Sequence, residues 1–208
     1  MKKGFFAVIG IFAVATFGLA ACNTLVPPSP PEGESVYDKL TEFARLEYDA
    51  ITLNVSTTLD GVTLAGIYSM TTTEEGIRVE YTYEKMNLIE KNEDGSYTVP
   101  DTVKSTHTGV GTIVDGVFTL ESGEAIDIAI SRLNVGMLSF AQHNFKNVAD
   151  EQGKFTADVE NPAAFLQTQL TCTAMKTEIA YTSTALSSVH ISYTSSENAQ
   201  IVLTYTFS

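Results

Sequence analysis

The clearest hydrophobic pattern of this 208-residue chain lies near its C-terminal end, where apolar and polar residues alternate in three successive runs. Each run contains a Tyr-Thr pair, and the pairs recur every 12 residues, at Tyr181, Tyr193 and Tyr205. Alternation predicts β-strands with one buried face, and this interval fits a strand plus a tight turn. We therefore predict a three-stranded antiparallel meander with its tyrosines on the apolar face. Because the middle strand runs backwards, Tyr181 and Tyr205 should lie at one end of the sheet and Tyr193 at the other.

Similar alternation fills the preceding part of the chain, where Asp-Gly turns at 60–61 and 115–116 separate two pairs of runs. Asp-Gly between alternating runs is a strong signal for a β-hairpin. On the apolar faces of the first runs lie Tyr68, Tyr81 and Tyr83. The strands predicted before the C-terminal meander span 51–56, 62–70, 77–83, 97–99, 110–114, 117–120 and 155–159.

Helical spacing appears at three places. Ser35 precedes apolar residues spaced three and four apart, which predicts a capped amphipathic helix over 35–49. A short helix or helical turn is predicted over 133–148, and one turn over 161–166, where Pro162 suits the first helical position. The predicted fold is mainly β, of the α+β class: an antiparallel meander of about nine or ten strands with an N-terminal helix and a short mid-chain helix. A sheet of this length can curl into a half-barrel, and the sequence leaves open whether it closes.

The N-terminal residues predict export. Lys2 and Lys3 precede an uncharged apolar run over 4–21, as in a secretory signal peptide, although an uncleaved transmembrane anchor is the alternative. The run ends in Leu19-Ala20-Ala21-Cys22, which resembles the lipobox of bacterial lipoproteins. That resemblance implies cleavage before Cys22 and a diacylglyceryl group on its thiol, so that lipid chains anchor the protein on the outer side of the cell membrane.

Four of the six prolines lie between Asn23 and Glu34, which predicts an extended tether. The predicted organisation is therefore a signal peptide over 1–21, a lipidated cysteine and tether over 22–34, and one sheet-rich domain over 35–208. Only Pro100 and Pro162 remain in that domain, as suits a sheet that needs its backbone donors.

Charge and composition limit the classes of partner that the protein is expected to bind. The chain has 25 acidic and 12 basic residues, and loss of Lys2 and Lys3 with the signal leaves a net charge of −15. Such a surface repels phosphate backbones, so a nucleic-acid partner is not expected. The 27 threonines, 9 tyrosines and absence of tryptophan favour a pleated, half-buried surface over helix interiors. We expect a monomer.

The sequence offers little for catalysis or metal binding. Cys172 stands alone once Cys22 carries lipid, and its strand-like surroundings suggest a buried small hydrophobe. The histidines show no metal-ligand spacing, and the acidic pairs lie in predicted turns or, for Asp158 and Glu160, on one strand face. We therefore expect no enzyme activity, no cofactor and no metal site. The three scattered histidines are His107, His143 and His190.

The tyrosine-bearing face allows two interpretations. Its ordinary role is a core covered by the first helix, and its functional role is a partly open face that holds an apolar ligand with tyrosine hydroxyls at the margin. The candidate ligand-binding residues are Tyr68, Tyr81, Tyr83, Tyr181, Tyr193 and Tyr205.

The predicted order of elements over 35–208 resembles the lipoprotein-carrier superfamily of LolA, LolB and LppX type proteins. The likeness rests on architecture, with no shared motif, and implies an unclosed barrel that carries acyl chains. The stretch from Phe155 to Cys172 is also similar to small surface lipoproteins of unknown function from Gram-positive bacteria, which implies location only. We expect a lipid-anchored extracytoplasmic protein that binds a hydrophobic or lipid ligand. The alternative is a surface interaction module or adhesin with a macromolecular partner.

Overall fold

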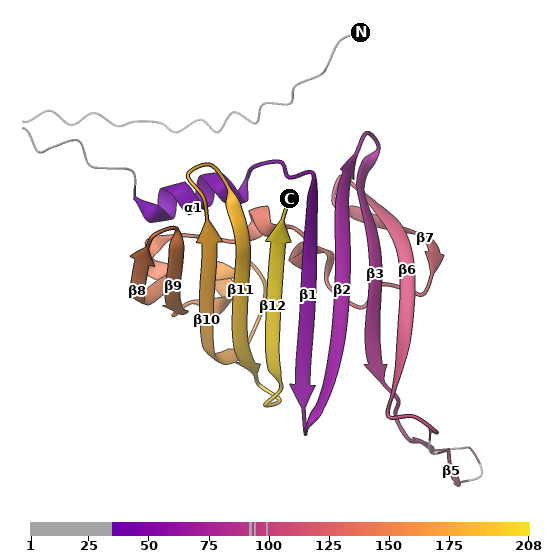
Figure 1. The fold of residues 1–208 in the computed structure, drawn as a ribbon. Coiled ribbons are helices and arrows are strands. Elements are labelled where there is room, and N and C mark those ends of the chain that lie inside the picture. The colour runs from indigo at the N-terminus through magenta and orange to yellow at the C-terminus, as the bar shows by residue number, and fades with distance from the viewer. Residues whose placement is uncertain (1–34, 92, 94, 99) are drawn as a thin grey trace, which may run out of the picture. The chain divides into compact units, whose positions relative to one another are not determined.

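The main element of the domain is one open antiparallel sheet of ten strands (Figure 1). The computed structural model describes residues 35–91, 93, 95–98 and 100–208, so the predicted signal peptide, Cys22 and the tether lie outside the described residues. Across the sheet the strands follow the order β7-β6-β3-β2-β1-β12-β11-β10-β9-β8, with β7 and β8 at the two edges. The mainly β prediction is confirmed, and the sheet stays unclosed.

The N-terminal half of the sheet is formed by β1 (Ala50–Leu59), β2 (Val62–Thr73), β3 (Gly76–Met86), β6 (Lys104–Val114) and β7 (Val117–Gly123). Its other half is formed by β8 (Phe145–Glu151), β9 (Lys154–Val159), β10 (Cys172–Tyr181), β11 (Leu186–Ser195) and β12 (Gln200–Phe207). Two short strands, β4 (Glu90–Lys91) and β5 (Tyr97–Thr98), pair with each other in the connection between β3 and β6.

Two hairpins form at the predicted Asp-Gly turns. Asp60 and Gly61 have φ angles of 50° and 80°, and Asp115 and Gly116 have φ angles of 50° and 79°. Positive φ at both central residues is the requirement of the two-residue turn whose twist matches that of the flanking strands. The local sequence therefore fixes the register of β1 with β2 and of β6 with β7 at these ends.

The predicted C-terminal meander is confirmed: β10, β11 and β12 are antiparallel neighbours in the sheet. Val189 on β11 faces Ile179 on β10 and Tyr205 on β12, whereas Tyr193 faces Ile201 near the other end of β12. Tyr181, the last residue of β10, pairs with Leu186, the first residue of β11. The predicted ends of the sheet for the three tyrosines are therefore correct.

A central seam joins the two halves, because β1 pairs with β12. Leu53 lies opposite Tyr205, and the backbone of Ala50 exchanges two hydrogen bonds of 3.0 Å with Ser208. The two strands nearest the middle of the sheet are thus the first and last strands in chain order.

Helix α1 (Val36–Ala44) begins where predicted but ends five residues earlier. Ser35 caps it by accepting a hydrogen bond from the Asp38 amide at 3.3 Å. At the other end, the Tyr48 hydroxyl donates to the Phe43 carbonyl at 2.9 Å and accepts from the Leu186 amide at 3.0 Å. The Tyr48 hydroxyl therefore bridges the helix end and β11, and residues 45–49 connect α1 to β1.

The predicted short helix or helical turn over 133–148 takes the form of 3-10 turns followed by strand β8. The turns are η1 (Ile130–Leu133), η2 (Val135–Met137) and η3 (Gln142–Asn144). Leu138 and Phe140 are both buried, at a spacing of two that an extended chain allows and a single helix face does not. Helix α2 (Pro162–Phe165) confirms the helical turn that begins at Pro162.

Within residues 35–208, as far as the structure describes them, helices and turns cover one face of the sheet, the inner face. Helix α1, the 3-10 turns and α2 pack against the inner face, and the segment between β7 and β8 lies behind the sheet as drawn in Figure 1. Around Phe145 a cluster of aromatic rings closes this layer, with centroid distances of 5.3 Å to Phe165 and 5.5 Å to Phe155. The outer face carries mainly polar side chains, so the core lies between the inner face and this cover.

Candidate functional site

The six candidate tyrosines lie on the inner face, as predicted, and mostly inside the core. Tyr68, Tyr81, Tyr83, Tyr193 and Tyr205 are each at most 4% exposed, and Tyr181 is half-buried. They form two groups, one on each half of the sheet. The structure therefore brings them together as packing residues. This arrangement agrees with the interpretation of the tyrosine-bearing face as a covered core.

The first group is a stack of three rings on β2 and β3. Ring centroids of Tyr68 and Tyr81 are 6.1 Å apart, and those of Tyr81 and Tyr83 are 6.2 Å apart. The Tyr83 hydroxyl donates to the Ala125 carbonyl at 2.6 Å, and the Tyr81 hydroxyl donates to the Glu124 carbonyl. These hydroxyls satisfy the backbone of the segment that crosses the inner face, so they are not free to bind a ligand.

The second group lies on the C-terminal meander. The Tyr205 hydroxyl donates to the Arg132 carbonyl at 2.8 Å, and burial raises the pKa of this phenol. The buried Tyr193 hydroxyl has no hydrogen bond of normal geometry; burial raises its pKa, and the nearby Arg132 guanidinium opposes that rise. Tyr181 donates to the Asp150 carboxylate and packs against Phe43 of α1 at a centroid distance of 6.3 Å.

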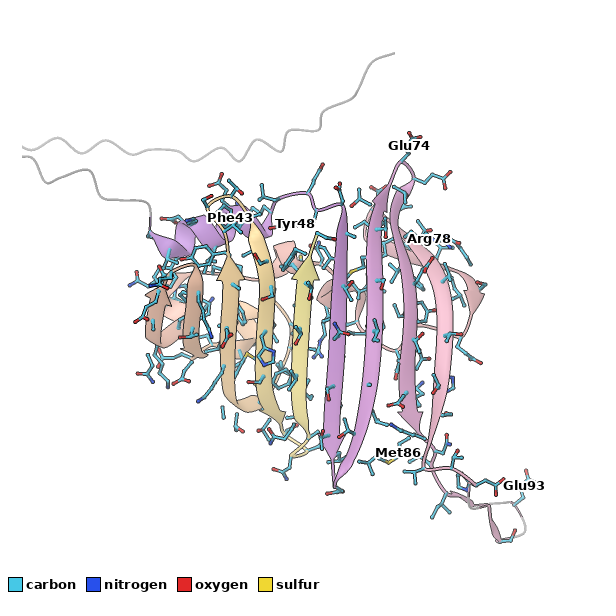
Figure 2. All side chains as sticks on the ribbon, in the orientation of Figure 1. Phe43, Tyr48, Glu74, Arg78, Met86 and Glu93 are labelled. Atoms are coloured by element: carbon cyan, nitrogen blue, oxygen red, sulfur yellow. The ribbon has the colours of Figure 1, made fainter. Side chains whose placement is uncertain are left out.

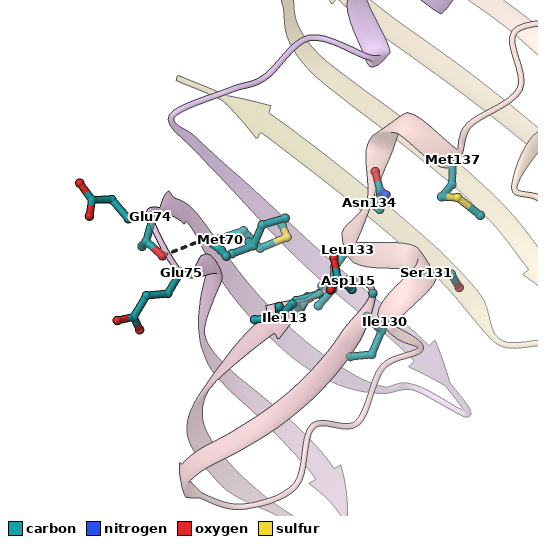
Figure 3. A pocket seen from close by; sticks show the side chains of 15 residues that line it. Met70, Glu74, Glu75, Ile113, Asp115, Ile130, Ser131, Leu133, Asn134 and Met137 are labelled. Carbon is teal, nitrogen blue, oxygen red and sulfur yellow. Dashed lines mark hydrogen bonds between the residues drawn. The ribbon is translucent and has the colours of Figure 1, made fainter. Parts of the chain in front are cut away.

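A groove lies elsewhere, at the end of the sheet where β2 meets β3 and β6 meets β7. We call it the β2–β3 groove, and it has two chambers that share Met70, Gly76, Ile77 and Leu133 among their lining residues. The larger chamber has a volume of about 650 Å³ and is shown in Figure 3. The smaller chamber has a volume of about 320 Å³ and extends beneath the end of α1. None of the six tyrosines lines either chamber.

The floor of the β2–β3 groove is apolar. Met70 on β2 and Ile113 on β6 face Leu133 of η1 across the larger chamber (Figure 3). Ile77 lines both chambers and remains 39% exposed. Other apolar residues that line the β2–β3 groove are Ile51, Leu46, Val114, Ile130, Val135 and Met137.

The groove exists because the helices and turns that pack on the inner face do not extend over the full width of the sheet. Helix α1 packs on the β9 to β11 side, where Leu40 is fully buried, and the cluster around Phe145 fills the same half. On the other half, of the part of the chain that the structure describes, the extended segment after β7 and the turns η1 and η2 cross the inner face. The ends of β2, β3 and β6 therefore keep part of their apolar surface in contact with solvent.

The sequence pattern did not predict this groove. Its floor comes from strands that the alternation predicted correctly and from residues within 130–137, for which the pattern predicts no strand and only part of a helix. Ile126, Ile128 and Ile130 alternate with polar or small residues, a signal for an extended segment that packs along a core. Which strand ends such a segment leaves open cannot be read from local spacing.

The other chemical candidates occupy ordinary structural positions. Cys172 is partly buried, and burial raises the pKa of its thiol. His190 is exposed on the outer face, 3.0 Å from the Thr204 hydroxyl. Asp158 lies 3.9 Å from the Lys176 ammonium, and Glu160 lies 3.4 Å from that of Lys146. Across the described residues, no three His, Cys, Asp or Glu side chains gather in a way that would hold a metal ion.

The fold and groove define a domain class: an open ten-stranded antiparallel sheet, covered on one face, with an apolar groove at one end of the cover. Comparison with known protein families gives no match for this chain, and comparison with curated proteins gives no significant match. Over the part of the chain that the structure describes, no helix has the length and apolar character required to cross a membrane.

Proposed function

We propose that this protein is a lipid-anchored, non-enzymatic extracytoplasmic protein that binds an amphipathic small molecule in the β2–β3 groove. The observation that carries the proposal is the larger chamber, with its apolar floor and a volume of about 650 Å³. Small-molecule sites commonly enclose about 300–1,000 Å³ and are lined mainly by apolar side chains with a few polar groups at the margin.

The lining residues suit a flexible apolar chain. Met70 of β2 and Met137 of η2 both line the larger chamber, and methionine adapts its shape to irregular partners because its side chain is unbranched. The smaller chamber continues past Ile77 to Ile51, so a ligand longer than one chamber has further apolar surface to follow. By contrast, the hollow bordered by Tyr68 and Tyr83 has a volume of only about 140 Å³.

The anchor is supported by the sequence, in residues outside the described part. Leu19-Ala20-Ala21-Cys22 at the end of an apolar run resembles a lipobox, and two or three acyl chains hold a protein on a membrane where one would be marginal. A protein held at a membrane surface meets amphipathic molecules that partition there, which agrees with a groove for such ligands.

Ile77 is the position at which to test groove binding. Ile77→Thr keeps the β-branched shape that suits a strand but replaces the ethyl group by a hydroxyl, so binding of apolar fluorescent probes should weaken several-fold. Ile67→Thr is the matched control, because Ile67 is 49% exposed and its register partners are Asn54 and Thr82, which point away from the groove. Equal loss in both variants, or no probe binding by the wild type, would contradict the proposal.

The anchor is tested separately. Cys22→Ala should abolish incorporation of labelled lipid and leave an uncleaved precursor, as measured by lipid labelling and by the mass of the protein from membrane fractions. Incorporation of lipid by the mutant would show that Cys22 is not the acceptor.

A second candidate function rests on the uncovered outer face. Exposed threonines extend across it from β7 to β12, and this broad polar surface suits a macromolecular partner, as in an adhesin. The exposed threonines on this face include Thr71, Thr82, Thr108, Thr119 and Thr206. Thr82→Lys with Thr108→Lys should reduce binding to extracellular matrix or envelope components if this candidate is correct, while Ile77→Thr should not.

A further inference from the structure

We propose that the ligand of the β2–β3 groove is a single-chain amphipath with a positively charged head group, such as a long-chain amine or quaternary ammonium. This inference rests on the proposed function and specifies the chemistry of its ligand. It follows from the charges at the mouth of the groove, the pairing of charges elsewhere on the sheet, and the orientation of α1.

Every formally charged side chain that lines the groove is acidic. Glu74, Glu75 and Asp115 line the larger chamber, and Glu47 lines the smaller one. Neither chamber has a lysine, arginine or histidine among its lining residues. A carboxylate or phosphate head group would therefore meet like charges, whereas an ammonium group would meet opposite ones.

The carboxylates of the groove differ from those on the outer face in their partners. On the outer face, Glu84 lies 2.7 Å from the Lys104 ammonium, Glu178 lies 2.8 Å from that of Lys154, and Glu121 lies 3.3 Å from the Arg78 guanidinium. None of the four groove carboxylates forms an ion pair with a basic residue in the described part of the chain. Their negative charge is therefore left for a ligand or for solvent cations.

The geometry separates a charged mouth from an apolar floor. Glu74 and Glu75 form the tip of the hairpin between β2 and β3, and Asp115 lies in the hairpin turn between β6 and β7. Figure 3 shows the side chains of Glu74 and Glu75 directed outward, while Met70 and Leu133 lie in the chamber. An ammonium group can thus stay hydrated at the mouth while its alkyl chain lies on the floor, which avoids the cost of burying a charge.

Helix α1 adds to the same preference. Its last residue, Ala44, lines the smaller chamber together with Leu46 and Glu47. The C-terminal end of a helix carries a partial negative charge and stabilises cations nearby. The positive charge of Arg45, the C-cap residue that follows Ala44, partly offsets this effect, so the negative potential at the groove comes mainly from the carboxylates.

The test compares three probes that share one alkyl chain length and differ in head group: a trimethylammonium, a neutral glucoside and a carboxylate, each below its micelle concentration. Calorimetry with the protein at low salt should show the cation bound up to about fivefold more tightly than the neutral probe, the upper end of the range for exposed charge pairs, with the anion weakest. The preference should shrink at high salt, because solvent-exposed charges are screened.

A variant pair separates the groove from the general acidity of the protein. Glu74→Gln, Glu75→Gln and Asp115→Asn together should remove most of the preference for the cation. The control removes three charges at or beside other hairpin turns, through Asp60→Asn, Glu151→Gln and Glu197→Gln, and should retain the preference. Asp60 and Asp115 are closely matched, since each has a φ angle of 50° and precedes a glycine in a two-residue turn.

The outcomes distinguish the two proposals. Similar binding of all three probes, or equal loss of preference in both triple variants, would overturn the cationic head group and leave the proposed groove function standing. Tightest binding of the anion would do the same. If no probe binds the wild-type groove, both the inference and the proposed function fail. Thermal unfolding of each variant without ligand checks that the domain is folded in every comparison.

Discussion

Aromatic rings lie against glycines at several points on the inner face. A Cβ atom on Gly109 would overlap the Tyr81 ring, and one on Gly111 would overlap the Phe118 ring. Tyr81 and Gly109 are also direct partners across β3 and β6. The missing side chain lets the ring lie flat on the neighbouring strand, from where its hydroxyl reaches the Glu124 carbonyl.

Gly109→Ala should therefore destabilise the domain by about 1–3 kcal/mol, the typical cost of extra volume in a packed core. Thr108→Ala is the control, because Thr108 is the neighbouring residue on the exposed outer face and should cost much less. Urea unfolding at equilibrium measures both. A Gly109→Ala protein as stable as the control would show that Tyr81 can move without loss.

Buried phenols make the stability of the domain sensitive to alkaline pH. Burial raises the pKa of Tyr68 and of Tyr181 to about 12, from 10.0 in the ordinary phenol. Between these values the unfolded chain has already lost the protons that the folded protein keeps, so stability falls as pH rises above about 10. The stabilising effect is complete below pH 10 and is lost as the pH passes through the folded pKa.

Tyr68→Phe should make this alkaline loss shallower, because the ring remains over Gly66 but no longer ionises. Melting temperatures across pH 8–12 would measure the slope for the wild type and the variant. If the two slopes agree, Tyr68 does not contribute to the alkaline transition.

The side-chain pattern predicted the correct face for each tyrosine, because a strand alternates its side chains strictly. It did not predict the partner of each hydroxyl. The carbonyls of Glu124 and Ala125 lie in the irregular segment after β7, and that of Arg132 lies in η1; the path of this part of the chain depends on contacts with distant strands. Alternation thus specifies burial, while the choice between packing and ligand binding depends on tertiary contacts.

Among the elements, those set by local turn chemistry were predictable and those set by packing were not. The Asp-Gly hairpins and the Ser35 cap formed at the predicted positions. The end of α1 and the 3-10 turns near Val135 differ from a continuous helical pattern, because Tyr48 bonds to Leu186 of β11 and Phe140 packs against Phe165 of α2. Short helices in proteins are stabilised mainly by such packing, so spacing alone gives uncertain ends.

Helix α1 should depend on its buried stripe. Leu40→Ala removes a fully buried side chain and should cost about 2–5 kcal/mol, since a cavity remains under the helix. Glu42→Ala is the control on the exposed side of the same helix and should be nearly neutral. Thermal unfolding of both variants checks this, and a small effect of Leu40→Ala would mean that the helix contributes little to the cover.

On the scale of the whole molecule, the candidate site arises because the sheet is wider than the layer of helix and aromatic rings that packs on it. Ten strands form one face, but α1 and the cluster around Phe145 cover only the half that contains β9 to β11. The sequence predicted the number of strands and a covering helix. It could not predict where the cover ends, because β1 joins β12 at the centre and so places the N-terminal hairpins on the side away from the helix.

Amide exchange should follow the order of strands in the sheet. Each of β1 and β12 has a paired neighbour on both sides, whereas β7 and β8 have a free edge. Amides of β1 and β12 should exchange most slowly in the wild-type protein, and those of β7 and β8 much faster. Hydrogen exchange measured by mass spectrometry would check this order, and equal protection at the edges would indicate that another molecule covers them.

The seam between β1 and β12 also constrains how the protein is made. Among the described strands, β1 is the first to be synthesised and its partner on the seam side is the last, so one edge of β1 stays unpaired while the other described strands of the sheet are assembled. Unpaired edges with an apolar face are templates for joining other chains. A premature stop after Ala199 would make this state permanent, and we expect the shortened protein to accumulate as aggregates instead of as a less stable monomer.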